Sequence, residues 1–243
     1  LYAIAGEKTL FISKEEVSAL WKPIDPIIKA WKENLVPLKI YTPDTDEIIK
    51  LTQENSRQKT TEKNIAIIGL GKIGAGIALQ LSEKGWSVSA YNRTASVTEE
   101  YEKSGLKGYY SIKELVDSLP SSKPKIVWVM VPAGAPVDDM LFGENGVINY
   151  LKKGDIIIDG GNSFYKDTIR RHKIISKKGI GYIDCGTSGG PYGARHGACL
   201  MIGGDRKFYT PIENLFEDIA RPNAYQFFDG AGTGHFAKMV HNG

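Results

Sequence analysis

The chain has 243 residues, of which 42% are hydrophobic and 24% are charged. These proportions are typical of a globular protein, and a formal net charge of +3 is too small to indicate a nucleic-acid partner. No apolar run approaches the roughly 20 residues of a membrane helix, and no signal-peptide pattern is visible. We therefore expect a cytoplasmic protein that binds neither nucleic acid nor membrane.

The two cysteines, Cys185 and Cys199, are too few for a disulfide framework, and we predict that both are buried free thiols. The four histidines and the cysteines show no metal-ligand spacing, so we predict no metal site. The chain starts at Leu1 rather than Met and stops at Gly243 inside a helical pattern. These ends indicate a piece of a longer protein.

The first part of the chain predicts a short α+β fragment. Residues Thr9–Ile12 are strand-like, and an amphipathic helix pattern runs from Lys14 to about Trp31. Residues 44–63 are polar and predict a solvated linker.

From Asn64 onward, short apolar runs alternate with helical stretches. Runs this short and β-branched, bounded by Gly and Asp, are typical of buried strands in a parallel sheet. Their alternation with helices predicts a doubly wound α/β domain, Rossmann-like, over residues 64–230. Residues 230–243 predict a glycine-rich turn that leads into a new helix. The predicted strands are Ile65–Ile68, Ser87–Tyr91, Ile126–Val131, Asp155–Asp159, Gly181–Asp184 and Cys199–Ile202.

The first strand runs into Gly69-Leu70-Gly71-Lys72-Ile73-Gly74, a G-x-G-x-x-G sequence followed by a helix. Gly69 permits a tight turn, Gly71 lets a pyrophosphate approach the backbone, and Gly74 lets the helix pack on the strand. A glycine-rich turn without a ligand is the alternative. The strand before it and the helix after it favour dinucleotide binding.

The second strand ends in Asn92-Arg93-Thr94, where an NAD enzyme usually has a carboxylate that binds the ribose hydroxyls. A carboxylate would repel a 2′-phosphate, whereas Asn92 does not, and Arg93 can pair with the phosphate. These residues favour NADP. The alternative is a surface arginine beside a helix cap at Thr94.

Glycines and small polar residues follow three more predicted strands. In such sheets ligands bind beyond the carboxyl ends of the strands, and glycine exposes backbone N–H groups that suit anions. Tight turns are the alternative. Ser188 has no obvious base partner, so a hydrolase nucleophile is not indicated. The segments are Val131-Pro132-Ala133-Gly134, Gly160-Gly161-Asn162-Ser163 and Gly186-Thr187-Ser188-Gly189-Gly190.

The last helix places Lys238, His241 and Asn242 on one face, at i, i+3 and i+4. A solvated face is one interpretation. The other is a lysine that faces a cofactor cleft, where burial lowers its pKa and lets it act as a general base. An earlier polar run, Arg170-Arg171-His172, predicts an exposed helix face.

Residues 64–243 resemble the 6-phosphogluconate dehydrogenases along their whole length. Val131-Pro132-Ala133 and Gly186-Thr187-Ser188 resemble the shorter bacterial branch; many members of that branch use NAD, so Asn92-Arg93 is a departure from it. The segments that carry the resemblance are Gly69–Gly74, Asn92–Thr94, Asp159-Gly-Gly-Asn-Ser163, Gly186-Thr-Ser-Gly-Gly190 and Gly232-Thr-Gly-His-Phe-Ala-Lys-Met-Val-His-Asn-Gly243.

The resemblance implies oxidative decarboxylation of 6-phosphogluconate to ribulose 5-phosphate, with NADP as hydride acceptor and Lys238 as the catalytic base. It implies a general-acid glutamate three residues after Asn242, and a helical domain, beginning at residues 231–243, that forms a homodimer or a higher homo-oligomer. The substrate residues would be Asn162, Ser188, Gly189, Gly190, His241 and Asn242. The cofactor residues would be Gly69, Leu70, Gly71, Lys72, Ile73, Gly74, Asn92, Arg93, Thr94, Val131, Pro132, Ala133 and Asn162.

Residues 1–43 resemble the C-terminal end of glucose-6-phosphate dehydrogenases, through Thr9–Ile12, Glu16-Val17, Trp21, Ile24–Ile28 and Trp31. The two resemblances together imply the junction of a fused enzyme of the pentose phosphate pathway.

Two alternatives stay open. One is another β-hydroxyacid dehydrogenase, such as a 3-hydroxyisobutyrate type; His241-Asn242-Gly243 speaks against it. The other is a cofactor-binding fragment that is inactive on its own, because the last helix would lack its packing partners.

Overall fold

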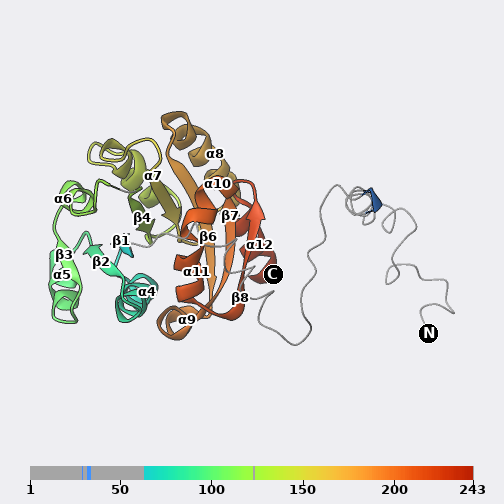
Figure 1. Cartoon of the computed structure of the whole chain (residues 1–243). Coiled ribbons are helices and arrows are strands. Elements are labelled where there is room, and N and C mark those ends of the chain that lie inside the picture. Colours follow the sequence, from blue (N-terminus) through green and yellow to red (C-terminus); the bar gives the residue numbers. More distant parts are fainter. Residues whose placement is uncertain (1–28, 30–31, 34–62, 123, 243) are drawn as a thin grey trace. The chain divides into compact units, whose positions relative to one another are not determined.

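The computed structural model of the chain describes residues 29, 32, 33, 63–122 and 124–242 (Figure 1). The predicted strand at Thr9–Ile12, nearly all of the predicted helix Lys14–Trp31 and the linker up to residue 62 lie outside the described residues. Near the predicted end of that helix, Lys29 and Lys32 are helical, and the amide of Glu33 donates to the carbonyl of Lys29 at 3.0 Å.

An eight-stranded sheet forms the centre of the described domain, with strand order β3-β2-β1-β4-β5-β6-β7-β8. The order grows outward from β1 in both directions, which confirms the predicted doubly wound fold. β3 and β8 were not predicted. The strands are β1 (Asn64–Ile68), β2 (Ser87–Tyr91), β3 (Lys107–Tyr109), β4 (Ile126–Val129), β5 (Ile156–Asp159), β6 (Gly181–Ser188), β7 (Ala198–Gly204) and β8 (Ala220–Asp229).

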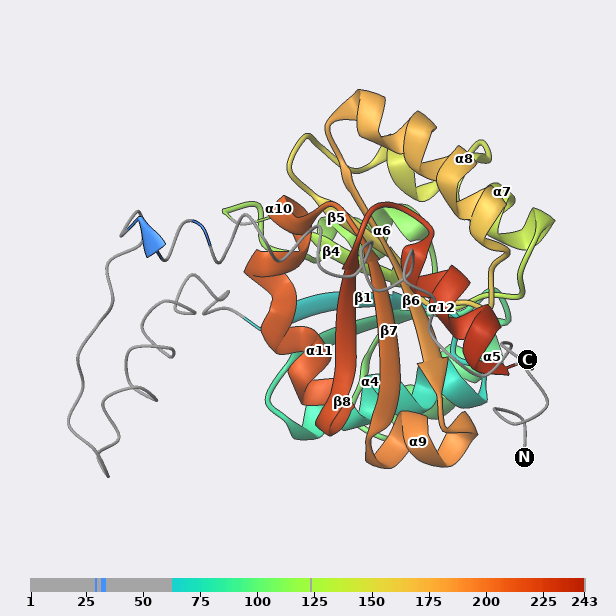
Figure 2. The same ribbon diagram turned by 90° about the vertical axis from the view of Figure 1, so that its right-hand side faces the viewer.

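Strands β1 to β6 are parallel, but β7 pairs antiparallel with β6, and β8 is parallel to β7. The prediction that Cys199–Ile202 belongs to a parallel sheet is therefore wrong. The segment between Ser188 and Ala198 is too short for a parallel crossover, which needs a dozen or more residues. The predicted strand also ended too early, at Asp184, because Gly186–Ser188 extend β6 and pair with β7 instead of following the strand. Figure 2 shows β6, β7 and β8 side by side.

Helices cover both faces of the sheet. None of the helices in the described ranges is long and apolar enough to cross a bilayer. The helices are α4 (Lys72–Glu83), α5 (Ala95–Glu102), α6 (Ile112–Asp117), α7 (Ala135–Phe142), α8 (Tyr165–Ile175), α9 (Gly190–His196), α10 (Arg206–Tyr209), α11 (Glu213–Ile219) and α12 (Thr233–Asn242), with short 3-10 turns η1 (Val147–Asn149), η2 (Ser176–Lys178) and η3 (Thr210–Ile212).

Two hydrophobic cores lie on opposite faces of the sheet because side chains alternate along each strand. Ile65 and Ile67 of β1 face α4, α9 and α11, where Phe216 packs on Trp128. Ala66 and Ile68 face α6 and α7. Full burial of each large side chain contributes about 1.5–3 kcal/mol, so both layers hold the strand ends in place.

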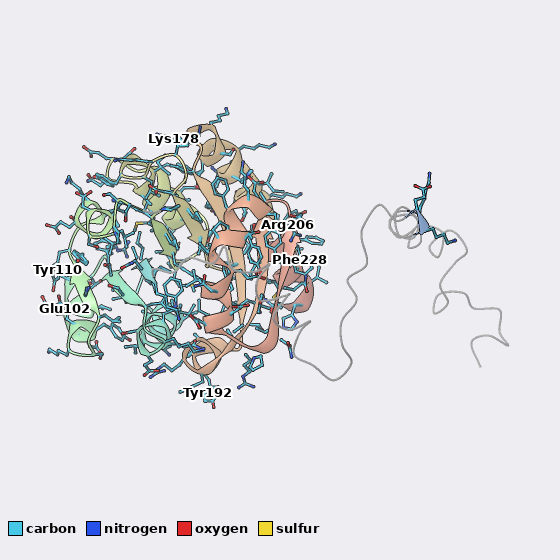
Figure 3. The ribbon with its side chains drawn as sticks, viewed as in Figure 1. Glu102, Tyr110, Lys178, Tyr192, Arg206 and Phe228 are labelled. Atoms are coloured by element: carbon cyan, nitrogen blue, oxygen red, sulfur yellow. The ribbon has the colours of Figure 1, made fainter. Side chains whose placement is uncertain are left out.

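The two cysteines differ in exposure, which corrects one prediction. Cys185 is buried but Cys199 is exposed, so the prediction that both thiols are buried is wrong for Cys199. Figure 3 shows Tyr110 and Glu102 together at the surface, where the Tyr110 hydroxyl donates to the Glu102 carboxylate at 2.9 Å. Tyr192 of α9 is 67% exposed and projects from the domain in the same view.

Candidate functional site

The turn between β1 and α4 has the geometry that the glycine pattern predicts. Gly69 has a φ of +97°, which favours glycine, and a Cβ at Gly74 would overlap the Gly69 carbonyl. A Cβ at Gly71 would meet nothing within 4 Å. Gly71 is the N-cap of α4 and brings no side chain to the helix end. The first amides of α4 are therefore open to an anion.

Asn92 at the end of β2 fixes this turn. Its Oδ1 accepts a hydrogen bond from the amide of Leu70 at 3.1 Å, and its Nδ2 donates to the carbonyl of Thr94 at 3.3 Å. Arg93 is exposed, and no hydrogen bond or ion pair engages it within the described residues. The guanidinium is available to a ligand in the adjoining groove.

That groove has a volume of about 600 Å³ and is lined by seven of the predicted cofactor residues. Its lining includes Gly69, Gly71, Asn92, Arg93, Thr94, Val131 and Pro132. Leu70 is buried and lines none of the cavities described in this section.

A second cavity of about 340 Å³ continues along the first turn of α4, across the ends of β4 and β5. Asn162 and Thr187 line its far side. The open phosphate turn and the two connected hollows fit an extended dinucleotide, with the pyrophosphate at the α4 N-terminus. The lining includes Lys72, Ile73, Gly74, Val131, Pro132 and Asn162, whereas Ala133 lines a third cavity described below.

The buried carboxylate of Asp184 on β6 anchors the start of α12. It accepts hydrogen bonds from the backbone amides of Gly232 and His235, both at 2.8 Å. Burial raises the pKa of Asp184, while the nearby His235 and the two amides act in the opposite direction. A carboxylate at a helix N-terminus satisfies orphan amides and complements the helix dipole.

Close glycine contacts seat α12 on β6 and β7. A Cβ at Gly234 would come within 2.5 Å of the Met201 carbonyl, and a Cβ at Gly186 within 2.8 Å of Cγ of Lys238. Figure 2 shows α12 next to β6. The expectation that α12 lacks packing partners in this chain is therefore wrong.

Lys238 is 9% exposed, although its neighbours Met239 and Val240 are 45% and 62% exposed. Burial lowers the pKa of Lys238, and the nearby Cys199 acts in the opposite direction. No hydrogen bond or ion pair holds its ammonium group within the described residues. A buried lysine with a lowered pKa has the property that a general base requires.

Ser188 and His241 meet beside this lysine. The Oγ of Ser188 lies 3.2 Å from Nε2 of His241, a contact between β6 and α12 that the sequence pattern did not reveal. Gly189, with a φ of +113°, and Gly190, with a φ of +59°, follow at the start of α9. Their conformations suit glycine and leave this backbone uncovered by side chains.

Asn162 and Asn242 line the third cavity, of about 460 Å³, together with Ala133 and His235. His235 is 3% exposed, and its Nδ1 lies 2.8 Å from Oγ1 of Thr168 on α8. Asn162 also lines the cavity at the phosphate turn. This residue therefore lies where the cofactor cavity and the α12 side of the site meet.

The prediction that Arg171 lies on an exposed face is wrong, because its side chain is fully buried. Its neighbour Arg170 is half exposed. Helical spacing alone gave no sign of this burial. Asp184 was also missed, although a carboxylate inside an apolar strand run is an unusual pattern. Within the described residues, His, Cys, Asp and Glu form no group of three or more that could hold a metal ion.

The fold, the open phosphate turn and the buried lysine define the cofactor-binding domain of a dinucleotide-dependent oxidoreductase. Residues 64–231 match the family described as the NAD binding domain of 6-phosphogluconate dehydrogenase. The chain belongs to this family.

Named relatives agree with this assignment. The Bacillus subtilis protein YqeC, provisionally named as a 6-phosphogluconate dehydrogenase, is 45% identical over 179 residues, which cover 74% of this chain and 58% of that protein. The decarboxylating 6-phosphogluconate dehydrogenase of Candida albicans is 39% identical, over 80% of this chain and 38% of that protein. The chain thus spans about two fifths to three fifths of these relatives.

Solved structures show the same fold. The Plasmodium falciparum 6-phosphogluconate dehydrogenase, described in complexes with NADP+ and with 6-phosphogluconate, is 34% identical with a TM-score of 0.68, over 74% of this chain and 39% of that one. A Mycobacterium tuberculosis 3-hydroxyisobutyrate dehydrogenase gives a TM-score of 0.67 at 23% identity, over 75% of this chain and 60% of that one. The second likeness shows the fold alone.

Proposed function

We propose that the protein containing this chain oxidatively decarboxylates 6-phosphogluconate to ribulose 5-phosphate with reduction of NADP. The observation that carries the proposal is the buried Lys238, held over β6 next to the Ser188–His241 pair. A base next to sites for a sugar acid and a dinucleotide is the constellation that oxidation of a hydroxyl requires.

Each residue has a defined task in this reaction. Neutral Lys238 takes the proton of the C3 hydroxyl, while C3 loses its hydrogen as hydride; the nicotinamide, when bound, accepts that hydride. The resulting 3-keto acid loses its carboxyl group as CO2, and the electron pair of the broken carbon–carbon bond forms an enolate. Protonated Lys238 then stabilises the enolate oxygen. A proton delivered to the carbon that lost CO2, by the general acid expected beyond Asn242, would complete ribulose 5-phosphate. Ser188, Gly189, Gly190, His241, Asn242 and Asn162 would hold the sugar acid.

We infer that NADP is preferred over NAD. Asn92 is already engaged with Leu70 and Thr94, and it brings no charge that would repel a 2′-phosphate. The exposed guanidinium of Arg93 borders the same groove and can form a charge-assisted fork with that phosphate. The cofactor complex described for the Plasmodium relative supports this inference.

The test is a substrate panel on the intact protein with NADP and with NAD. We expect reduction of NADP and release of one CO2 per 6-phosphogluconate, with little oxidation of 3-hydroxyisobutyrate. Oxidation of 3-hydroxyisobutyrate without CO2 release would favour the alternative dehydrogenase. Reduced cofactor without CO2 from 6-phosphogluconate would contradict the decarboxylating mechanism.

We further propose that the intact protein forms a homodimer or higher homo-oligomer through a helical domain that begins at α12. Phe236, Met239 and Val240 lie at i, i+3 and i+4 on this helix and are 46%, 45% and 62% exposed, so they form an apolar face that a further helix could cover. Light scattering on the intact protein gives the oligomeric state, and a monomer would contradict the proposal.

The fusion with a glucose-6-phosphate dehydrogenase is a separate proposal. It rests on the resemblance of residues 1–43, which lie almost entirely outside the described residues. The intact protein should also reduce NADP with glucose 6-phosphate. A natural protein in which no such domain precedes residue 1 would contradict it.

A further inference from the structure

Two loops flank the inner end of the dinucleotide groove. One follows β4 and contains Val131 and Pro132; the other follows β5 and contains Asn162. They are in close contact, since a Cβ at Gly161 would lie 2.9 Å from the Val131 carbonyl. The distance between these loops sets the width of the site in which a substrate meets a cofactor.

A single buried side chain joins both loops. The guanidinium of Arg171, on α8, donates to the Gly134 carbonyl at 3.0 Å, at the end of the β4 loop. It also donates to Oγ of Ser163 at 3.3 Å, at the end of the β5 loop. A third bond reaches Oδ1 of Asp138 on α7 at 2.9 Å. Figures 1 and 2 show that α7 and α8 lie on the same side of the sheet.

The buried carboxylate of Asp159, at the end of β5, also holds the β5 loop and lies next to the Arg171 guanidinium. Asp159 is 1% exposed and accepts bonds from the Gly161 amide at 3.2 Å and from Ser163 Oγ at 2.9 Å. Tyr182 of β6 donates to the same carboxylate at 2.8 Å, and Nη1 of Arg171 lies 3.5 Å from it. Asn162 therefore lies between two residues, Gly161 and Ser163, that are both fixed by hydrogen bonds.

Carboxylates surround the two arginines of this network. Arg171 pairs with Asp138 and Asp159, and Arg170 pairs with Asp138 and, at 3.7 Å, with Asp167. Burial alone would raise the pKa of Asp138, but hydrogen bonds from Arg171 and Arg170 lower it. The guanidinium of Arg171 is fully buried, so water does not compete for its hydrogen bonds. Because the group is planar and rigid, its N–H donors hold their acceptors in one geometry.

We propose that Arg171 is a positioning residue for hydride transfer: it sets the separation between Asn162 and the Val131–Pro132 loop, and with it the approach of the oxidised carbon to the nicotinamide. The proposal rests on the proposed oxidoreductase function. Arg171 contacts neither ligand; it acts through Gly134 and Ser163. Misplacement of reacting groups by about 1 Å can cost on the order of 100-fold in rate.

Arg171→Lys tests this in the intact protein, with Arg170→Lys as the matched control. Lysine keeps the charge but cannot reach Gly134, Ser163 and Asp138 together. Arg170 bonds Asp138 and reaches neither loop. We expect Arg171→Lys to lower kcat by about 10- to 100-fold while the Kd for NADP stays within about threefold. The kinetic isotope effect on kcat, with deuterium at the oxidised carbon, should rise. Arg170→Lys should match the wild type in all three.

Ser163→Ala provides a second variant in case Arg171→Lys does not fold. It removes the hydrogen bond from Arg171 to the β5 loop and keeps every charge. It should therefore lower kcat less than Arg171→Lys does, with an isotope effect larger than that of the wild type. Wild-type kcat and isotope effect in the folded variants would overturn the proposal, as would equal losses in Arg170→Lys and Arg171→Lys. The assay uses whichever hydroxy acid of the panel the wild type oxidises, so inactivity on 6-phosphogluconate refutes the proposed substrate and leaves this test intact.

Discussion

Gly186 on β6 lies directly under Lys238 on α12, so closely that a Cβ at Gly186 would come within 2.8 Å of the lysine Cγ. The Gly186→Ala variant must therefore push α12 away from the sheet. We expect a loss of about 1–3 kcal/mol in the free energy of unfolding, as for overpacked cores, and a fall in kcat of the intact protein. Urea denaturation measures the first. Cofactor affinity should fall less than kcat, because the phosphate turn lies between β1 and α4 and only Thr187, next to Gly186, lines the inner cavity.

The two glycines around the start of α4 should behave in opposite ways. Gly71→Ala adds a methyl group to open space, so stability should change little, but the methyl group occupies the path of the pyrophosphate and should weaken cofactor binding strongly. Gly74→Ala would overlap the Gly69 carbonyl and should destabilise the domain itself. Thermal unfolding and cofactor titration of this chain separate the two effects. Equal melting temperatures of the two variants would contradict the turn geometry.

Arg93→Ala tests the choice of cofactor. Loss of a charge-assisted contact to the 2′-phosphate should weaken NADP binding by about 1.5–3 kcal/mol and leave NAD binding unaltered. Calorimetry with both dinucleotides gives the two values. If the wild type binds NAD as tightly as NADP, the inference from Asn92 and Arg93 is wrong.

Lys238 should control the pH dependence of the rate. A general base works in its neutral form, and burial lowers the pKa of Lys238 from its ordinary value of 10.5. The value of kcat/KM should therefore rise as the pH increases through the lowered pKa of Lys238. At pH values below that pKa the lysine is protonated, so kcat/KM should be low. Lys238→Met should abolish turnover without loss of NADP affinity, whereas Lys173→Met, at an exposed position on α8, should be neutral. Activity of Lys238→Met within tenfold of wild type would remove the lysine from this role.

The two cysteines should differ in reactivity. Cys185 is fully buried, and burial raises the pKa of its thiol. Cys199 is exposed, at the position of β7 whose backbone lies opposite Ser188 of β6. Iodoacetamide should label Cys199 in the folded chain and spare Cys185 until urea is added. Mass spectrometry of the peptides reports this directly. Equal labelling in the native state would contradict the burial of Cys185.

Local patterns predicted the parts of the site that depend on local geometry. The glycines of the phosphate turn follow from their spacing, and the end of β2 from the chemistry of its residues. Helical spacing put Lys238, His241 and Asn242 on one face but left a solvated face open, and the burial of Lys238 comes from the structure. The antiparallel β7 was missed because strand composition does not reveal direction; the short connection through α9 decides it. The burial of Arg171 and the anchoring of α12 by Asp184 were missed because both depend on partners 33 and 51 positions away in the sequence.

The glycine contacts of α12 have a mechanical consequence. Since Asp184, Gly186 and Gly234 fasten this helix to β6 and β7, Lys238 belongs to the same rigid body as the phosphate turn. Any hinge motion of segments that follow α12 would move their groups relative to the lysine, while the distance from the lysine to the dinucleotide groove stays constant. In the proposed reaction, such a motion would change the distance from those groups to the substrate without realigning the base.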